Sequence, residues 1–221
     1  MSISNNLTQI KSQLPTHVTL VAVSKTKPVA DLMEAYDAGQ RIFGENKIQE
    51  MTDKWEVMPK DIEWHMIGHV QTNKVKYMAP YVSLIHGVDS LKLLQEINKQ
   101  AAKNNRVIDC LLQVYIAEEE SKFGLDEQEL EEMLKQVQHD KDNFKNIKIV
   151  GLMGMATFTE NQNQIEKEFK HLKTIFDKYK NLNTEHCQLN TLSMGMSGDY
   201  QLAISCGSTM VRIGSSIFGS R

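Results

Sequence analysis

Short apolar runs alternate with amphipathic segments along the whole chain, and this alternation predicts its secondary structure. Apolar runs bounded by polar or turn residues are typical of buried strands, whereas apolar positions spaced three and four apart are typical of helices. We expect strands at residues 18–25, 41–46, 63–68, 82–89, 109–117, 147–156, 191–196 and 210–215. Helices are expected between them, and the clearest covers 160–180, where one side carries Ile165, Phe169, Leu172, Phe176 and Tyr179.

This order of elements indicates the fold class. Strands that alternate with helices form parallel sheets. Eight such units predict an α/β protein with a closed (β/α)8 TIM barrel, built as a single domain over residues 1–221. An open, doubly wound sheet is the structural alternative, but no GxGxxG sequence follows the first strand.

Composition and charge narrow the classes of function. The apolar residues make up 41% of the chain and the charged residues 24%, which is usual for a soluble globular protein. A net charge of -3 gives no reason to expect nucleic acid or an anionic membrane as a partner. Cys110, Cys187 and Cys206 form neither a CxxC nor a zinc pattern, so we expect reduced thiols and no metal site. With no signal-peptide core or spanning apolar run, a cytoplasmic location is expected.

The first apolar run, VTLVAVSK, ends in Lys25. The two-residue period of a strand places Lys25 on the same face as Val21 and Val23. An exposed lysine at a strand end is the ordinary interpretation. If this face lines the barrel, however, the amine lies in the mouth at the carboxyl ends of the strands, where barrel active sites form. Desolvation would lower the pKa of such an amine, which could then attack an aldehyde and form a Schiff base.

The last two predicted strands end in glycines beside hydroxyl residues, in TLSMGMS and TMVRIGSS. Gly195 and Gly214 would let the backbone approach an anion closely, and Ser193, Ser197 and Ser215 are candidate hydrogen-bond donors to phosphate. Loops after the seventh and eighth strands are the customary phosphate site of this fold. Tight turns alone would use the same residue types.

Two further side chains need a partner if they are buried. Arg212 lies two residues before Gly214 and so on the same face of the last strand. Beside a pyridine ring, its permanent charge would keep the ring nitrogen unprotonated and weaken the ring as an electron sink. From spacing alone, a salt bridge between Arg212 and an acid is an equally good interpretation. His65 is interpreted as a buried, hydrogen-bonded histidine, because no HxH, HExxH or acidic cluster accompanies it.

Taken together, the motifs along the chain match those of a known family. The runs VAVSKTKP, FGEN, IQE, EWHMIGHVQTNK, ESKFG, GLMGMA, LSMGMSGD and GSTMVRIGSSIFG follow one another from about residue 18 to 220, and the chain resembles the pyridoxal phosphate homeostasis proteins. These are single-domain relatives of the barrel domain of alanine racemase. The resemblance implies a (β/α)8 barrel that binds pyridoxal 5'-phosphate (PLP) as a Schiff base on Lys25. It further implies cofactor contacts from Asn46, Ser193, Ser197, Arg212, Gly214 and Ser215, with Arg212 near the pyridine nitrogen.

Three positions qualify this resemblance. Tyr115 stands where the family often has asparagine, so contacts of that position are not carried over. Ser215 stands where threonine often follows the RIG motif, and it keeps the hydroxyl. Lys122 resembles a family lysine near the cofactor entrance, which the resemblance associates with acceptance or release of cofactor.

The resemblance implies a carrier that keeps free aldehyde low and delivers PLP to apoenzymes. Alanine racemase needs a second domain that contributes a catalytic tyrosine, and the sequence ends just after the eighth predicted strand. Without a second acid or base, two-base racemisation has no obvious route. We therefore expect no enzyme activity and, since the racemase dimer depends on the second domain, a monomer. The alternatives are a weak PLP-dependent amino-acid racemase or lyase, and a barrel that binds another phosphate ligand.

Overall fold

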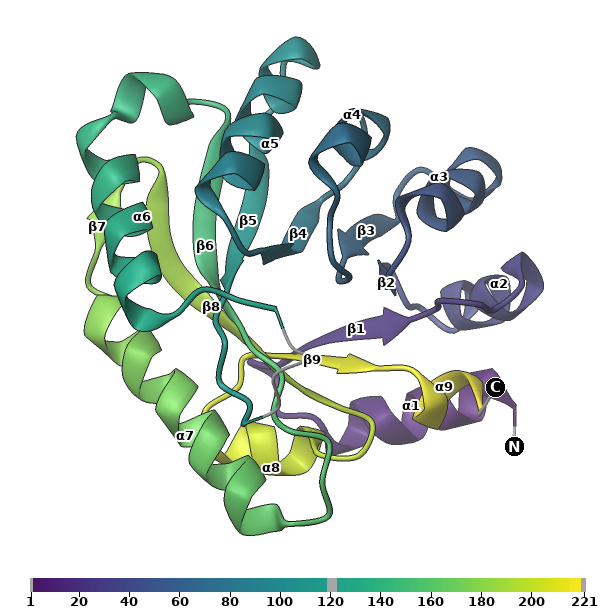
Figure 1. The fold of residues 1–221 in the computed structure, drawn as a ribbon. Coiled ribbons are helices and arrows are strands. Elements are labelled where there is room, and N and C mark those ends of the chain that lie inside the picture. The colour runs from purple at the N-terminus through teal and green to yellow at the C-terminus, as the bar shows by residue number, and fades with distance from the viewer. Residues whose placement is uncertain (1, 119–122, 220–221) are drawn as a thin grey trace.

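The computed structural model describes residues 2–118 and 123–219, and within them eight parallel strands form a closed barrel (Figure 1). The barrel strands are β1 (Thr19–Val23), β2 (Ile42–Glu45), β3 (Glu63–Met66), β4 (Leu84–Val88), β5 (Ile108–Gln113), β6 (Ile147–Met153), β8 (Cys187–Met196) and β9 (Met210–Ile213). Each strand pairs with the next, and the pairing of β1 with β9 closes the ring. The predicted (β/α)8 barrel is confirmed, and the open doubly wound alternative is wrong.

Helices surround this barrel (Figure 1). They are α1 (Ile3–Gln13), α2 (Val29–Asp37), α3 (Ile48–Val57), α4 (Val75–Met78), α5 (Leu91–Lys103), α6 (Glu127–His139), α7 (Gln162–Tyr179), α8 (Tyr200–Ser205) and α9 (Ser215–Phe218), with 3-10 turns η1 (Thr72–Lys74) and η2 (Lys141–Phe144). Side-chain caps fix several starts; Ser90, for example, accepts a hydrogen bond from the Leu93 N–H at the start of α5. None of the helices described here is long and apolar enough to cross a membrane.

Most strand boundaries differ from the sequence expectation by a few residues, and three of these differences change how the chain is connected. The last strand ends at Ile213, and residues 215–218 form α9, which packs beside α1 (Figure 1). The strand β8 begins at Cys187, earlier than expected, and its start pairs with a short antiparallel strand, β7 (Asn183–Thr184). The strand β5 ends at Gln113, because the chain then leaves the sheet and Val114 forms an isolated bridge with Leu125. The apolar run continues past Gln113 because the departing segment is still buried.

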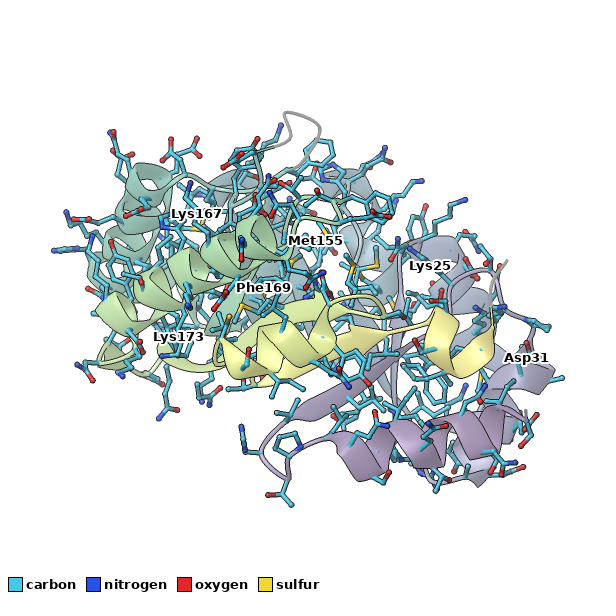
Figure 2. The ribbon with its side chains drawn as sticks, turned by 90° about the horizontal axis from the view of Figure 1, so that it is seen from below. Lys25, Asp31, Met155, Lys167, Phe169 and Lys173 are labelled. Carbon is cyan, nitrogen blue, oxygen red and sulfur yellow. The ribbon has the colours of Figure 1, made fainter. Side chains whose placement is uncertain are left out.

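The core has an outer and an inner part, and both follow from strand alternation. The outer part lies between the barrel and its helices and includes Ala22 of β1 and Phe169 of α7; Figure 2 labels Phe169. The inner part fills the barrel with Val21, Leu84, Leu111, Val150, Met153 and Met210. The inward position of Val21 confirms the expected inner face of β1. The next residues with that parity are Val23 and Lys25, at the carboxyl ends of the strands.

Candidate functional site

A cavity of about 540 Å³ lies at the carboxyl end of the barrel, where this fold normally places its active site. Its walls come from residues in or after β1, β2, β3, β5, β6, β8 and β9, and Figure 2 labels two of them, Lys25 and Met155. Six of the seven site residues expected from the sequence line it: Lys25, Asn46, Ser197, Arg212, Gly214 and Ser215. The barrel therefore gathers side chains from the two ends of the sequence around one space.

Lys25 lies half-buried in a loop that is held on both sides. The next residue, Thr26, has a φ of 65°, which is unusual for a β-branched residue. Its N–H donates to Oε1 of Glu50 at 2.5 Å, which anchors this strained position to α3. Farther along, the Lys27 ammonium donates to the Phe218 carbonyl at 3.0 Å. These bonds fix the backbone from which the Lys25 side chain enters the cavity.

A buried ion pair supports this loop from behind. Oε1 of Glu45 accepts from the Ser24 hydroxyl at 2.6 Å and from the Lys54 ammonium at 2.7 Å. Lys54 also donates to the Ser24 carbonyl at 2.8 Å and to Glu50 at 2.8 Å. Burial raises the pKa of the Glu45 carboxyl, while the Lys54 ammonium opposes that shift. Lys54 thus connects α3 to both the end of β2 and the residue before Lys25.

Sequence analysis overlooked this support, although the sequence contains a signal for it. Ile48, Met51 and Lys54 occur at a spacing of three along α3 and all are buried. A lysine on an otherwise apolar helix face requires a buried partner. That partner is Glu45, whose outward position at the end of β2 follows from strand alternation.

Arg212, on β9, is buried at the cavity wall with only 4% of its surface exposed. Its Nη1 donates to the Ser193 carbonyl at 3.0 Å and to the Ser193 hydroxyl at 2.6 Å, and its Nη2 donates to the Gly154 carbonyl at 3.2 Å. Burial lowers the pKa of the guanidinium to about 10, so it stays charged at neutral pH. Among the described residues no carboxylate lies within ion-pair distance of Arg212, although the charge of Asp199 raises the pKa of the guanidinium and so partly offsets burial.

The hydrogen bonds of Arg212 leave part of the guanidinium unused. A guanidinium has five N–H donors. Arg212 donates three hydrogen bonds to residues of the described chain, two to Ser193 and one to Gly154. Its remaining donors therefore have no recorded protein acceptor there. Because Arg212 lines the cavity, an acceptor atom of a ligand is the natural partner for them.

Ser193 lies elsewhere than we expected from the sequence. It is fully buried and does not line the cavity; its hydroxyl lies against Arg212 and against the His86 ring. Ser193 lies within β8, whereas Ser197 follows the end of that strand at Met196 and lines the cavity. Ser193 therefore contacts Arg212 in this structure, and its expected contact with phosphate stays a prediction.

The remaining hydroxyl and glycine residues form one wall of the cavity. The Gly214 N–H donates to the Ser197 hydroxyl at 3.1 Å, which joins the ends of β9 and β8. A Cβ atom at Gly214 would lie 3.1 Å from the Val23 carbonyl oxygen, so a larger residue would press against β1. At Gly195, a φ of +97° requires glycine for the turn of the backbone. Ser215 is exposed at the start of α9.

Aromatic side chains border the mouth of the cavity, and the sequence analysis did not single them out. Phe123 and Phe158 are 59% and 93% exposed, and the His69 ring stacks on Phe123 with 4.7 Å between ring centroids. Tyr115 is half-buried and does not line the cavity. Lys122 lies outside the described residues, so its expected role at the entrance stays a prediction.

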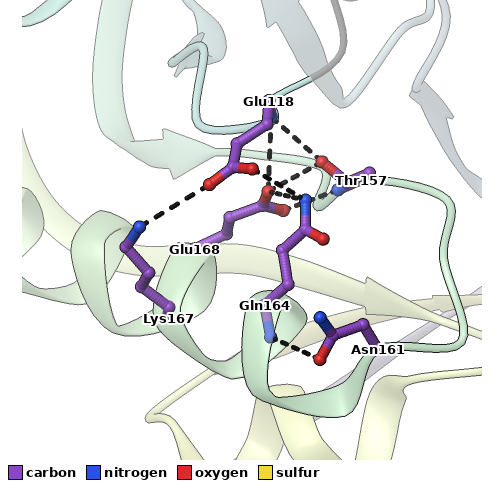
Figure 3. A network of polar contacts seen from close by, with 6 residues as sticks. All are labelled: Glu118, Thr157, Asn161, Gln164, Lys167 and Glu168. Carbon is purple, nitrogen blue, oxygen red and sulfur yellow. Dashed lines mark hydrogen bonds and ion pairs between the residues drawn. The ribbon is translucent and has the colours of Figure 1, made fainter.

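Glu168 of α7 ties together two of the segments that border the cavity (Figure 3). Its Oε2 accepts from the Thr157 N–H at 2.6 Å, and its Oε1 accepts from the Thr157 hydroxyl at 2.7 Å. The Glu118 N–H and the Gln164 amide each donate to the same Oε1 at 3.3 Å. Because Thr157 directly precedes Phe158, this buried carboxylate positions the chain after both β5 and β6.

The described chain contains no group of three or more histidine, cysteine, aspartate or glutamate side chains placed to hold a metal ion. The cavity therefore offers the amines of Lys25 and Lys27, the Arg212 guanidinium, the His69 imidazole, side-chain amides, hydroxyl groups and backbone N–H groups. This set suits a ligand that carries a carbonyl carbon, an aromatic acceptor and an anionic group.

Comparison with known proteins identifies relatives that match the whole chain. The family model described as alanine racemase, N-terminal domain, matches residues 1–221. The pyridoxal phosphate homeostasis protein of Pasteurella multocida is 37% identical over 234 residues, which cover 100% of this chain and 98% of that protein. PipY of Synechococcus elongatus has been solved without PLP and with PLP bound. These structures match with TM-scores of 0.91 and 0.88 at 35% and 34% identity, covering 99% of this chain and 100% of PipY.

A more distant likeness concerns the fold alone. The alanine racemase of Clostridium difficile in complex with cycloserine matches with a TM-score of 0.80 at 14% identity, and the match covers 100% of this chain but 60% of the racemase. Its barrel therefore resembles this one, whereas its sequence is too different to transfer residue roles. From the matched family model and the close, full-length relatives, we conclude that the chain belongs to the alanine racemase N-terminal domain family and, within it, to the pyridoxal phosphate homeostasis proteins.

Proposed function

We propose that this protein binds PLP through a Schiff base on Lys25, holds it as a protected reserve and delivers it to apoenzymes. One observation carries the proposal: Lys25, Arg212 and the Ser197–Gly214 wall line the same cavity, in a protein whose relatives are named for PLP homeostasis. PLP supplies an aldehyde that reacts reversibly with amines, and the Lys25 amine is the group suited to it.

The other cofactor groups also have counterparts among these residues. The phosphate would be held by the hydroxyls of Ser197 and Ser215 and by Gly214, as in the usual phosphate site of the fold. The ring nitrogen would accept from Arg212, whose unused donors are described above. Asn46 lines the same cavity after β2 and is proposed as a further cofactor contact.

Arg212 also favours a carrier over a catalyst. The guanidinium remains charged near neutral pH, so it donates a hydrogen bond to the ring nitrogen and opposes its protonation. An unprotonated pyridine withdraws electrons weakly and gives little help to carbanion formation. A site of this kind binds the aldehyde well while doing little amino-acid chemistry, which suits storage and release.

Delivery is tested with a PLP-dependent enzyme stripped of its cofactor. We expect the loaded protein to restore activity to this apoenzyme, and we expect Lys25→Ala to restore none after removal of free PLP. Lys92→Ala, which changes an exposed lysine on α5 away from the cavity, is the matched control and should behave as the unaltered protein. Equal reactivation by Lys25→Ala would contradict the proposal.

A weak racemase or lyase is the second candidate, since the fold resembles alanine racemase. A panel of amino acids separates the two functions. Steady turnover that disappears in Lys25→Ala would support the enzyme, whereas absence of turnover together with reactivation of apoenzyme supports the carrier. If the protein bound another phosphate compound but not PLP, neither the carrier nor the PLP-dependent enzyme would be supported.

A further inference from the structure

A line of hydrogen bonds crosses the barrel interior behind Arg212. The Ser193 hydroxyl, which accepts from Arg212, lies 3.2 Å from Nδ1 of His86. In turn, Nε2 of His86 lies 3.1 Å from Nδ1 of His65. These residues come from β8, β4 and β3, and all are buried. The sequence predicts a buried, hydrogen-bonded His65 but carries no signal for its partner His86.

Counting donors and acceptors gives this line a direction. Arginine can only donate, so the Ser193 oxygen is an acceptor toward Arg212. The proton of that hydroxyl needs an acceptor, and in the described chain the one recorded within hydrogen-bond distance is Nδ1 of His86. His86 then carries its proton on Nε2 and donates to Nδ1 of His65. In the reverse direction, the buried Ser193 proton would have no recorded acceptor, which is unfavourable.

The far end of the line reaches another opening. His65 lines a separate cavity of about 310 Å³, together with Glu63 and Asp109. The Nε2–H of His65 can meet water or a carboxylate there, so the last donor of the line need not stay unsatisfied. Every group from this cavity to Arg212 can therefore be hydrogen-bonded with both rings neutral.

We propose that His65 and His86, acting through Ser193, are positioning residues that orient Arg212 toward the pyridine nitrogen of the bound cofactor. This inference rests on the proposed PLP-binding function. The histidines touch no ligand; they fix the Ser193 hydroxyl as an acceptor, and this acceptor, with the Ser193 and Gly154 carbonyls, holds one side of the guanidinium. The other N–H groups are thereby turned to the cavity.

Neutral rings are what this arrangement requires. Burial lowers the pKa of His65 to about 3 and holds the pKa of His86 well below its ordinary value, with the neighbouring His65 and Arg212 lowering the latter further. A protonated His86 would place a second cation beside Arg212 and would turn its Nδ1 into a donor toward Ser193. The line would then lose its direction.

The first test needs no cofactor. Long-range ¹H–¹⁵N spectra of the protein without PLP report which ring nitrogen of each histidine carries the proton. We expect His65 and His86 to be neutral with the proton on Nε2 at pH 7. A proton on Nδ1 of His86, or a doubly protonated ring, would overturn the proposed direction whether or not PLP binds.

The second test concerns the effect on Arg212. With PLP labelled with ¹⁵N in its ring, Ser193→Ala is expected to shift the ring-nitrogen signal and to weaken PLP binding about tenfold, the effect of one lost hydrogen bond to a charged group. Ser208→Ala is the matched control: Ser208 is equally buried but donates only to main-chain carbonyls such as that of Met194. We expect it to leave the ring signal unchanged.

Two variants of His86 test its part separately. His86→Leu removes the acceptor for the Ser193 hydroxyl and should reproduce the spectral shift of Ser193→Ala, whereas His86→Asn keeps an acceptor near Nδ1 and should restore much of the original signal. If His86→Leu does not fold, the ring-nitrogen signal of Ser193→Ala still tests whether Ser193 positions Arg212. Tight PLP binding with an unchanged ring signal in Ser193→Ala would overturn the positioning role alone, and failure of the unaltered protein to bind PLP would overturn the proposed function.

Discussion

Individual buried charges mark the functional end of this barrel. Arg212 is a buried cation whose recorded acceptors are neutral, and Lys54 is a buried cation paired with Glu45 directly behind the Lys25 loop. Both arrangements are costly, because charges lose hydration when they are buried. They are also well defined in geometry, which is what a site needs to hold an amine and a guanidinium at fixed places around one ligand.

The pair formed by Lys54 and Glu45 makes a prediction about stability. Lys54→Met leaves the Glu45 carboxylate buried without its cation, and we expect the free energy of unfolding to fall by about 3 kcal/mol in urea titrations. Adding Glu45→Gln should recover part of this loss. Lys170→Met, which breaks the exposed pair with Glu166, should cost less than about 1 kcal/mol. Equal losses for the two lysine variants would contradict our account.

His65 makes a prediction about pH. Its pKa is about 3 in the folded protein and ordinarily 6.5, so the unfolded chain binds a proton that the folded protein does not. The contribution of His65 to the free energy of unfolding is therefore complete above pH 6.5 and is lost as the pH falls toward 3. Between pH 7 and pH 5 this loss amounts to about 2 kcal/mol. Urea unfolding of His65→Gln should show a pH dependence that is smaller by this amount. His171→Gln, at an exposed site on α7, serves as the control.

At the scale of elements, loops and helices outside the barrel position the ends of its strands. The helix α3 does this for Lys25 through Glu50 and Lys54, and α7 does it for the segments after β5 and β6 through Glu168. In each case a polar side chain from a helix satisfies backbone groups where the strand pairing stops. The helices α3 and α7 thus contribute to the site without lining the cavity.

Glu168→Gln tests this role of α7. The amide that replaces one carboxylate oxygen cannot accept from Thr157, so we expect a loss of about 1–3 kcal/mol in stability. Backbone amides of Glu118 and Thr157 should exchange hydrogen faster. Glu166→Gln changes an exposed ion pair on the same helix and should leave both quantities nearly unchanged. Unaltered exchange at Thr157 in Glu168→Gln would show that the network does not hold this segment.

Most elements could be predicted from the sequence, and the misses have physical causes. The period of apolar residues located the barrel strands and placed Lys25, Arg212 and the late glycines at the correct pole. It did not give depth along a strand, so it could not show that the Ser193 hydroxyl accepts a hydrogen bond from Arg212. It also could not show contacts between elements, such as the pairing of His86 with His65.

At the scale of the whole molecule, closure of the barrel creates the site. The pairing of β1 with β9 brings the start of the chain against its end, so Lys25 and Gly214 line one cavity although nearly the whole barrel separates them in sequence. The cavity exists only in the folded state. Ligand binding should therefore stabilise the entire fold rather than one segment.

This stabilisation can be measured by thermal unfolding. PLP at about 100 times its Kd contributes about 2.7 kcal/mol, which corresponds to a rise of roughly 5–10 °C in Tm for a protein of this size. Lys25→Ala at the same PLP concentration should show a much smaller rise, and Lys92→Ala should match the unaltered protein. Pyridoxal without phosphate should stabilise less, because the Ser197–Gly214 wall then has no anion to bind.

The most direct measurement of the central claim is to identify the residue that holds the cofactor. The protein is mixed with PLP, its visible absorbance is recorded, and borohydride reduction is followed by peptide mass mapping. Our account predicts a visible Schiff-base band and a reduced PLP adduct on Lys25. Absence of the band, or an adduct spread over surface lysines such as Lys11 and Lys180, would contradict it.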